Sequence, residues 1–538
     1  MRIPVLGKLF GRKKEGYSYR VYRSIHSHRR KAGIFYFPFR WLFRTAARIQ
    51  HSEIDVIGLE NIPPDGSVLL VGNHPNSFLD YFNLLTVVRH PIATAAKDTL
   101  TKVPVFGPLM RDHALFIPIA RKQDQSLTKV SEEERKQAND QSIQVLVDHL
   151  VDGRLFNIYA EGRSTDSRKL NKIKLGFMFA VIQAEKQFNF RLNLKIVPYG
   201  YYYDRINKFQ SSVCLIFGKP FRIRIRDLVD LPEDYMSQSE SRRNDLEKRI
   251  MVEGKRRLES EINDLIISIN DLSLIDIIDE ATALLILTPV KYMNSFGNIK
   301  EKYRLSKNLS DKFQLAAKSD EGRKRLETLK DTIRAYRKKL KSANLRDAVV
   351  RREKSKSALG FGLLSLLQGI LLLPLIIPGY ITSFLPRRIA GLSRKYIIDI
   401  KKMPRVDGDE KAVLGAFFTS VLNYPALAGL TYWALTRFAW PPLSQWAAQW
   451  PEQAFPAGTI SYLLGSHPQL TAVLISILAF FFLIWLWGFS VRRGRRFRTG
   501  LRWFGDMITS VFREKKLEPF RELRYQIIDE IDGIMEDY

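Results

Sequence analysis

The stretch VGNHPNSFLDYF, from Val71 to Phe82, places a histidine and an aspartate close together between apolar residues. The run before it, GSVLLVG, has the length and composition of a buried strand. Ser77 and Asp80 have the spacing of a helix N-cap and the third residue of the helix, as in a capping box. The stretch therefore predicts a strand, a turn carrying His74, and a helix.

Five residues separate His74 from Asp80. Six positions along a regular helix turn through about 600°, which would place the two side chains on different faces. They can meet only if His74 lies in the turn and Asp80 in the first helical turn. Asp80 would then hold one ring nitrogen, and the other could take a proton from an alcohol. Alternatively, Asp80 only caps the helix and His74 is an ordinary turn residue.

Residues 52–230 alternate short strand-like runs with helix-like runs, which predicts an α/β fold. The clearest strand-like runs are GSVLLVGNH, RLFNIYAEG, LNLKIVPYGYYY and SVCLIFGKPFRI. Residues 231–357 are charged and helix-periodic, and they predict amphipathic helices with solvated basic faces. Their apolar spacing does not hold the clean heptad of a coiled coil.

The basic N-terminal segment, residues 1–51, contains an aromatic and arginine-rich helix-like run at residues 35–50, FYFPFRWLFRTAARIQ. Arg40, Arg44 and Arg48 recur every fourth residue and would share one helix face. Two interpretations fit: a helix lying in the membrane interface, or an amphipathic helix packed on the domain.

The hydrophobic region, residues 358–491, contains three long uncharged runs at 358–386, 412–436 and 470–490. Each is long enough to cross a membrane as a helix. Basic residues flank the first run on both sides, which predicts a re-entrant segment with both ends in the cytoplasm. The other two are predicted to span the membrane, and residues 492–538 to form a cytoplasmic tail. The chain is thus expected to be an integral membrane protein whose catalytic domain is cytoplasmic.

The chain of 538 residues has 85 Lys and Arg against 56 Asp and Glu, a formal net charge of +29. This excess favours anionic partners, namely lipid headgroups, phosphorylated substrates or nucleic acid. Basic clusters border the uncharged runs and no nucleic-acid-binding module is present, so we expect membrane lipids and no nucleic acid. Cys214 is the single cysteine, which excludes an intramolecular disulfide, and the eight histidines form no ligand-spaced metal cluster.

A second polar motif, IYAEGRSTD, follows a strand-like run with four candidate site residues: Glu161, Gly162, Arg163 and Ser164. Arg121 ends another such run, ALFIPIAR, and Lys97 in TAAKDTL is a weaker candidate for an anionic substrate. The run KIVPYG is expected to end a further strand at Pro198. Singly, each arginine is best explained by a surface salt bridge. Together, one base and two arginines at strand ends describe a site for a phosphorylated alcohol.

The segments GNHPNSFLD, FIPIAR, YAEGRS and IVPYG resemble the four ordered blocks of the glycerolipid acyltransferase superfamily. The blocks cover about residues 50–225, and they imply a mixed sheet flanked by helices. The resemblance implies His74 as general base and Asp80 as the residue that orients it. The remaining candidates are implied to bind or order the substrate: Arg121 and Arg163 at the acceptor phosphate, with Gly162, Glu161, Ser164 and Lys97 around it.

The extra residue between His74 and Asp80 resembles the branch with fungal-type glycerol-3-phosphate and dihydroxyacetone-phosphate acyltransferases and their bacterial relatives. Members of that branch also have a charged helical insert and hydrophobic C-terminal segments. Ala160 departs from the usual proline before Glu161, which puts the local geometry in doubt.

The resemblance predicts a membrane-bound glycerol-3-phosphate O-acyltransferase that uses acyl-CoA or acyl carrier protein as co-substrate and needs no other cofactor. Lysophosphatidate and dihydroxyacetone phosphate are the alternative acceptors. A non-catalytic basic protein that binds membranes or nucleic acid is the alternative of a different class.

Overall fold

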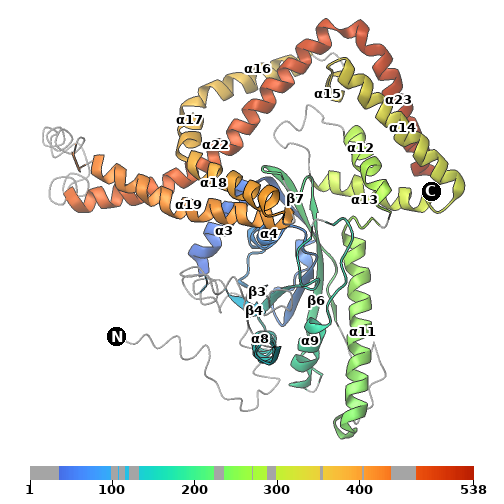
Figure 1. The fold of residues 1–538 in the computed structure, drawn as a ribbon, viewed down its shortest axis with the longest axis vertical. Coiled ribbons are helices and arrows are strands. Elements are labelled where there is room, and N and C mark those ends of the chain that lie inside the picture. The colour runs from blue at the N-terminus through green and yellow to red at the C-terminus, as the bar shows by residue number, and fades with distance from the viewer. Residues whose placement is uncertain are drawn as a thin grey trace.

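The chain was analysed as a computed structural model (Figure 1). It describes residues 36–97, 107, 115–119, 132–165, 167–188, 190–206, 208–222, 235–269, 271–286, 299–351, 356–402, 405–434, 436–437 and 468–538. The candidate Arg121 and most of the N-terminal basic segment therefore lie outside the described residues.

A mixed eight-stranded sheet organises the first part of the chain. Its strands are β1 (His51–Ile57), β2 (Val68–Gly72), β3 (Ile92–Lys97), β4 (Phe116–Ile119), β5 (Leu155–Tyr159), β6 (Lys195–Tyr203), β7 (Ser211–Phe217) and β8 (Phe221–Arg222). The strand order is β1-β7-β6-β2-β5-β3-β4, and β8 pairs with β6. Central β2 is parallel to both β5 and β6, whereas β6 and β7 are antiparallel. The predicted α/β fold with a mixed sheet is confirmed.

Helices cover both faces of the sheet, and β2 is therefore buried on both sides. Val68 and Leu70 join a core with α3 (Tyr36–Gln50) and α4 (Phe78–Val87). Leu69 and Val71 face the opposite way, into a core with α8 (Glu132–Val151), α9 (Gly176–Lys186) and α11 (Glu240–Leu265). This near-continuous apolar run is typical of a parallel strand between two helical layers.

Strand β6 continues past the expected end at Pro198 to Tyr203, so that expectation is wrong. Proline lacks an N–H group, but the Pro198 carbonyl accepts a hydrogen bond from the Gly218 N–H at 2.8 Å. Tyr199, Tyr201 and Tyr203 then alternate along the strand and all enter the core beside α4. The extension brings tyrosines next to the candidate site.

Helix α3 matches parts of both interpretations of the N-terminal segment. Phe43 stacks on Phe82 of α4, with ring centroids 4.6 Å apart, whereas Phe37 and Trp41 on the other face are exposed. Arg40 of this helix is buried and donates to the backbone carbonyls of Val88 and Arg89 after α4.

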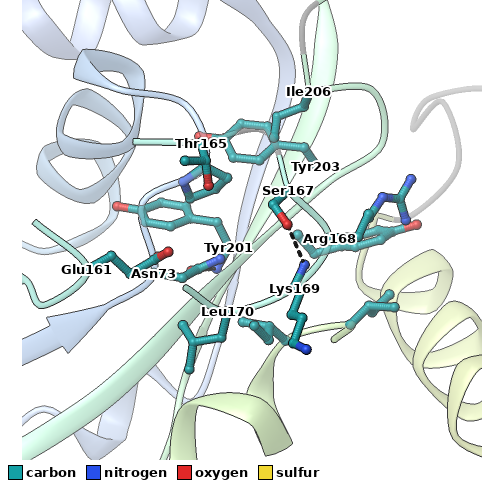
Figure 2. Close-up of a pocket in the computed structure, with 14 residues that line it drawn as sticks. Asn73, Glu161, Thr165, Ser167, Arg168, Lys169, Leu170, Tyr201, Tyr203 and Ile206 are labelled. Atoms are coloured by element: carbon teal, nitrogen blue, oxygen red, sulfur yellow. Dashed lines mark hydrogen bonds between the residues drawn. The ribbon is translucent and has the colours of Figure 1, made fainter. Parts of the chain in front are cut away.

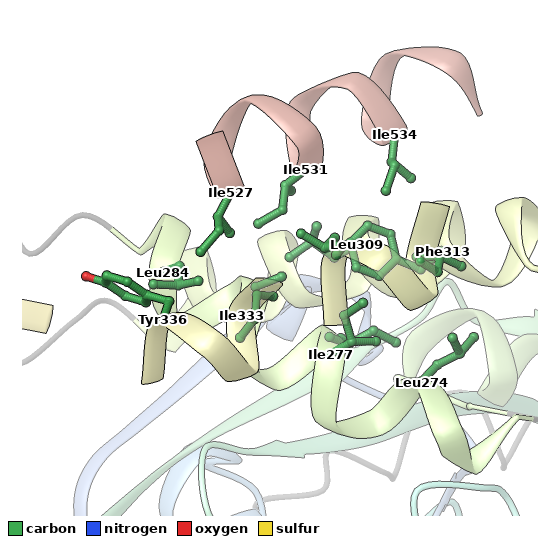
Figure 3. Close-up of a cluster of buried hydrophobic side chains, with 14 of the residues drawn as sticks. Leu274, Ile277, Leu284, Leu309, Phe313, Ile333, Tyr336, Ile527, Ile531 and Ile534 are labelled. Atoms are coloured by element: carbon green, nitrogen blue, oxygen red, sulfur yellow. The ribbon is translucent and has the colours of Figure 1, made fainter. Parts of the chain in front are cut away.

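The charged region forms a further core, to which β6 and β7 also contribute side chains (Figure 3). It consists of α12 (Ile275–Leu285), α13 (Ile299–Ala316), α14 (Asp320–Ser342) and α15 (Asp347–Val350), together with the C-terminal helix α23 (Glu514–Asp537). Ile527, Ile531 and Ile534 of α23 point into this core and are fully buried. The end of the chain is therefore packed against the charged helices.

The described part of the hydrophobic region contains the helices α16 (Lys356–Leu371), α17 (Leu373–Thr382), α18 (Phe384–Lys395), α19 (Arg405–Ala434) and α22 (Pro468–Phe512). Helices α16 and α17 lie along α22 (Figure 1). Among the described residues, one segment, Val473–Ser510 within α22, is long and apolar enough to cross a membrane. The predicted boundary at residue 491 falls inside α22. The re-entrant path of residues 358–386 stays a prediction.

Large apolar side chains are exposed on these helices. Examples are Leu364, Leu371, Ile381, Leu422, Leu430 and Leu478. An extended apolar surface of this kind marks a contact with a membrane or with another protein.

Candidate active site

The turn between β2 and α4 brings the predicted pair together. Ser77 is the N-cap residue and Asp80 is the third residue of α4, while His74 lies outside the helix. The His74 Nδ1 and Asp80 Oδ2 atoms are 2.9 Å apart. The geometric condition set by the five-residue gap is therefore met.

The expected capping box, however, is not formed. The Ser77 side chain makes no cap hydrogen bond, and Ser77 has a φ of 50°. The Asp80 carboxylate turns away from the Ser77 N–H and accepts the Asn76 N–H at 2.7 Å. The Ser77 N–H instead donates to the Ser164 Oγ at 2.8 Å. The Asp80 carboxylate thus holds both the backbone of the turn, through Asn76, and the ring of His74.

Asp80 is fully buried, and within the described part of the chain its carboxylate accepts three hydrogen bonds. Besides His74 and the Asn76 N–H, the Tyr203 hydroxyl donates to its Oδ1 at 2.5 Å. Burial raises the pKa of Asp80, and these three donors oppose that rise because they stabilise the carboxylate. Donors from the turn and from β6 therefore fix the orientation of this group.

The His74 ring is also held from its face and through its backbone. It stacks on Tyr159, with ring centroids 3.9 Å apart and an interplanar angle of 10°. The backbone N–H of His74 donates to the Glu161 Oε1 at 2.8 Å, and the backbone carbonyl of His74 accepts the Thr165 N–H at 3.1 Å. The His74 side chain is 19% exposed. Because Nδ1 faces Asp80, Nε2 is the nitrogen left for a substrate.

Glu161 links the second motif to this turn. Its buried carboxylate accepts the His74 N–H and also the Asn171 N–H at 3.0 Å. The Asn171 side-chain amide donates to the same carboxylate and, at 2.6 Å, to the Thr165 hydroxyl. Burial raises the pKa of Glu161, and the Asn171 and His74 donors oppose the rise. Glu161 thereby braces the backbone of the histidine.

Three further site candidates, Gly162, Arg163 and Lys97, differ in backbone conformation and exposure. Gly162 has a φ of 71°, but a Cβ there would meet Lys174 only at 3.4 Å. The positive φ favours glycine at this position, and a close approach of its backbone to the substrate stays a prediction. Arg163 is exposed, and Lys97 is half-buried at the end of β3.

A small polar cleft of about 100 Å³ borders the turn on one side (Figure 2). Its polar and charged lining includes Asn73, Glu161, Thr165, Ser167, Arg168 and Lys169. Arg168 Nη2 donates to the Asp279 Oδ2 of α12 at 2.8 Å, and Ser167 Oγ accepts the Lys169 N–H at 3.1 Å. Arg168 and Lys169 were not predicted as site residues, although they lie close after the EGRSTD motif.

A larger apolar cavity of about 530 Å³ borders the turn on the other side. Asn76 and Leu79 line it at the start of α4, whereas Asn73 and Pro75 line the polar cleft. Helices α3, α18, α19 and α22 supply most of the remaining wall. The turn that carries His74 therefore lies between a small, partly polar cleft and an apolar cavity.

Tyr159, Tyr203 and Asn171 are parts of the site that the sequence analysis missed. Tyr203 was missed because β6 was expected to end at Pro198. The alternation of tyrosines in KIVPYGYYY is the signal that would have placed Tyr203 on the same face as Tyr199.

Residues 53–202 match the model of the family described as Acyltransferase. No curated protein sequence matches this chain. Among solved structures, the chain is similar to the 1-acyl-sn-glycerophosphate (LPA) acyltransferase PlsC from Thermotoga maritima. The sequence identity is 16%, the TM-score is 0.27, and the match covers 42% of this chain and 81% of that chain. The family match assigns an acyltransferase-type domain to the segment that contains His74, Asp80 and Glu161.

Proposed function

We propose that this chain is a membrane-bound glycerol-3-phosphate O-acyltransferase that produces lysophosphatidate. The observation that carries the proposal is the position of the His74–Asp80 pair, at the turn between a small polar cleft and an apolar cavity. An acyl transferase needs both spaces, since its acceptor is polar and its donor carries a hydrocarbon chain. The family match over residues 53–202 supports acyl transfer as the reaction class.

In this mechanism His74 Nε2 accepts the proton of the acceptor hydroxyl as the oxygen attacks the thioester carbonyl. Asp80 keeps the proton on Nδ1 and stabilises the imidazolium that forms. The carbon–sulfur bond then breaks, and the thiolate leaving group takes the proton from His74. An ester and a free thiol are the products, and no covalent enzyme intermediate is required.

The polar cleft supports a small acceptor. Its volume of about 100 Å³ and its partly polar lining, which includes Lys169, suit glycerol 3-phosphate better than a lipid. Arg163 and Lys97 are proposed to attract the acceptor phosphate together with Arg121, and Lys169 adds a cation to the cleft itself.

The exposed apolar helices and the net charge of +29 support a membrane location with the catalytic domain on the cytoplasmic side. The same positive charge would attract either acidic donor, acyl-CoA or acyl carrier protein. No cofactor beyond this co-substrate is included in the proposal.

The direct test is acyl transfer by the purified full-length protein in liposomes. Glycerol 3-phosphate, dihydroxyacetone phosphate and lysophosphatidate are offered in parallel with each labelled donor. We expect glycerol 3-phosphate to be the best acceptor. We also expect His74→Ala to lower kcat by about a hundredfold or more, because it removes the general base. His149→Ala on α8 is the control, and full activity of His74→Ala would remove this residue from the mechanism.

Arg163→Ala tests the phosphate-binding role separately. It should mainly raise the KM for the acceptor, because it removes binding common to the ground state and the transition state. Arg191→Ala, another exposed arginine of the same domain, serves as the control. An unchanged KM in Arg163→Ala would exclude a contact with the phosphate.

A further inference from the structure

A buried polar chain continues from Asp80 on the side away from His74. The Tyr203 hydroxyl donates to the Asp80 Oδ1 at 2.5 Å and accepts a hydrogen bond from the Asn83 side-chain amide, whose Nδ2 is 3.0 Å away. The same Nδ2 is 3.2 Å from the Nε2 atom of His51. Asn83 is 0% exposed and His51 is 2% exposed, so water does not compete for these contacts. The chain therefore joins the candidate base to the start of β1.

Asn83 is brought to this chain by the helix that carries Asp80. It lies three positions after Asp80 in α4, so the two side chains share one helix face. All residues from Phe78 to Leu85 are buried, and an amide in such surroundings is unfavourable unless it is hydrogen-bonded. The hydrogen bonds to β1 and β6 therefore account for a polar residue at this position.

The direction of these hydrogen bonds is set at the His51 end. His51 Nε2 faces an N–H group and must accept, so the ring proton is on Nδ1, which lies 3.4 Å from the Ser211 Oγ. Burial lowers the pKa of His51 to about 4, which keeps the ring neutral at physiological pH. Both amide hydrogens of Asn83 are then used on His51 and Tyr203. Within the described part of the chain, the Asn83 Oδ1 has no hydrogen-bond partner, so the amide keeps this orientation at the expense of its own acceptor.

The opposite direction is open to the same three side chains. With the amide turned over, the Asn83 Oδ1 would accept from both neighbours, and the Tyr203 proton would point to Asn83. Asp80 would then lose one of the donors that stabilise its carboxylate. The orientation of a single buried amide therefore decides whether Tyr203 supports Asp80.

We propose that Asn83 is a positioning residue for the candidate active site. Held by His51, its amide directs the Tyr203 hydroxyl to Asp80. Asp80 is thereby kept as the carboxylate that orients the His74 ring. No proton moves along the chain, because its role is to fix one direction of hydrogen bonding before the substrate binds. That this arrangement assists acyl transfer rests on the proposed function.

The main test is Asn83→Asp in the purified full-length protein, which reverses the hydrogen bonds and keeps the shape of the side chain. The new carboxylate accepts from the Tyr203 hydroxyl and from His51, whose added proton balances its charge. We expect kcat to fall about tenfold to a hundredfold with little change in KM, because Asp80 loses a hydrogen bond to a charged group. In this background Tyr203→Phe should lower kcat further by less than about twofold, since the hydrogen bond is already absent.

Two control variants separate the direction of the hydrogen bonds from the mere presence of a contact. Asn83→Leu removes the amide without offering an acceptor, so Tyr203 keeps donating to Asp80, and Tyr203→Phe should still lower kcat about tenfold or more. Asn157 of β5 is the matched control, because it is fully buried and its Oδ1 already accepts the Tyr199 hydroxyl of β6 at 2.6 Å. The full effect of Tyr203→Phe should therefore persist in Asn157→Asp.

His51→Leu reaches the same chain without adding a carboxylate, and it decides the question if Asn83→Asp does not fold. It removes the acceptor that holds the Asn83 amide, so the effect of Tyr203→Phe on kcat should shrink in this background as well.

Infrared difference spectra across pH follow the Asp80 carboxyl in the protein without substrate. The band is assigned in each background by its absence from the matching Asp80→Asn protein. Asn83→Asp, His51→Leu and Tyr203→Phe should each make Asp80 titrate at a higher pH than in the wild type, because the Tyr203 donor lowers the pKa of Asp80.

An effect of Tyr203→Phe on kcat that is equal in the wild type, Asn83→Asp and His51→Leu would overturn the inference. An Asp80 titration that neither of these two variants shifts would overturn it too. If the wild type transfers no acyl group to any acceptor, the proposed reaction fails, and the infrared titration alone decides the inference. A shifted titration in such an inactive protein would support the positioning of Asp80 and refute only the proposed reaction.

Discussion

Tyr203 is the residue through which β6 acts on the candidate base. Its hydroxyl donates to Asp80 and accepts the Asn83 side-chain amide at 3.0 Å. We expect Tyr203→Phe to lower kcat about tenfold to a hundredfold, because a hydrogen bond to a charged group is lost, with little change in KM. Since this donor lowers the pKa of Asp80, its loss should also move the acid limb of the activity profile to higher pH.

Tyr202→Phe is the matched control for that variant. Tyr202 lies on the opposite face of the same strand, where its hydroxyl is 3.0 Å from the Ser306 hydroxyl. Steady-state kinetics across pH distinguishes the two variants. An equal loss in both would indicate general damage to β6, and a Tyr203→Phe profile like that of the wild type would remove Tyr203 from the positioning of Asp80.

His51 makes the stability of the protein depend on pH. It is fully buried at the start of β1, and burial lowers its pKa from 6.5 to about 4. Between these values the unfolded chain binds a proton that the folded chain does not. Stability is therefore full above pH 6.5 and is lost as the pH falls toward 4, by about 3 kcal/mol.

Thermal unfolding of the purified protein between pH 4 and 7.5 measures this dependence, and His51→Gln isolates it from other groups. The difference in unfolding free energy between variant and wild type should shift in favour of the variant as the pH falls. A difference that is constant across this range would contradict the low pKa.

At the scale of single residues, the sequence predicts those positions that depend only on the local geometry of the chain. The five-residue gap and the rotation of a helix were enough to place His74 in the turn and Asp80 in the first helical turn. The partners of the pair were not predictable in the same way. Tyr159 and Asn171 come from other elements, so their contacts depend on strand order and on the path of the loop after Glu161.

At the scale of elements, β2 and β6 are joined through a close packing contact at the end of β2. Gly72 pairs with Tyr199 across the two strands, and a Cβ on Gly72 would lie 2.5 Å from the Tyr199 ring. Gly72→Ala should therefore lower the unfolding free energy by about 1–3 kcal/mol, because the ring is packed and cannot move freely.

A double-mutant cycle with Tyr199→Leu checks that cause. Gly72→Ala should lower the unfolding free energy clearly less in the Tyr199→Leu background than in the wild type, because the ring with which the new Cβ clashes is absent. Denaturant unfolding of all four proteins gives the coupling. Additive effects would show that Gly72 is needed for its backbone and not for the Tyr199 ring.

Elements were predictable where hydrophobic period and length agreed. The apolar runs before His74 and Glu161 form β2 and β5, since each is short and ends in a turn. The end of β6 was not predictable from Pro198 alone, because a proline is accepted in a strand when only its carbonyl is used. The regular spacing of Arg40, Arg44 and Arg48 predicted that they share one helix face, but it could not predict that tertiary packing buries Arg40 against the end of α4.

At the scale of the whole molecule, the C-terminal helix α23 connects the hydrophobic region to the charged helices and the sheet. Helix α23 packs in the core of the charged helices, and Tyr202 and Cys214 of the sheet contribute to the same core. Arg524 of α23 also donates to the Asp347 Oδ1 of α15 at 2.9 Å. Such contacts join residues that are hundreds of positions apart, so the sequence pattern predicted the helices without predicting their common core.

The contacts of α23 also require the catalytic domain and the C-terminus to lie on one side of any membrane that α22 crosses.

This arrangement makes the topology testable in a chain whose single cysteine is buried. A Cys214→Ser background carries one new cysteine at a time, at Lys401, Gln445 or Lys515. We expect a membrane-impermeant maleimide to label Gln445→Cys in intact cells, because residues 439–462, between the two runs predicted to span, contain no Lys or Arg. Lys401→Cys and Lys515→Cys should react only after permeabilisation. Labelling of Lys401→Cys in intact cells would disprove the re-entrant path of residues 358–386. Labelling of Lys515→Cys in intact cells would place the catalytic domain outside the cytoplasm.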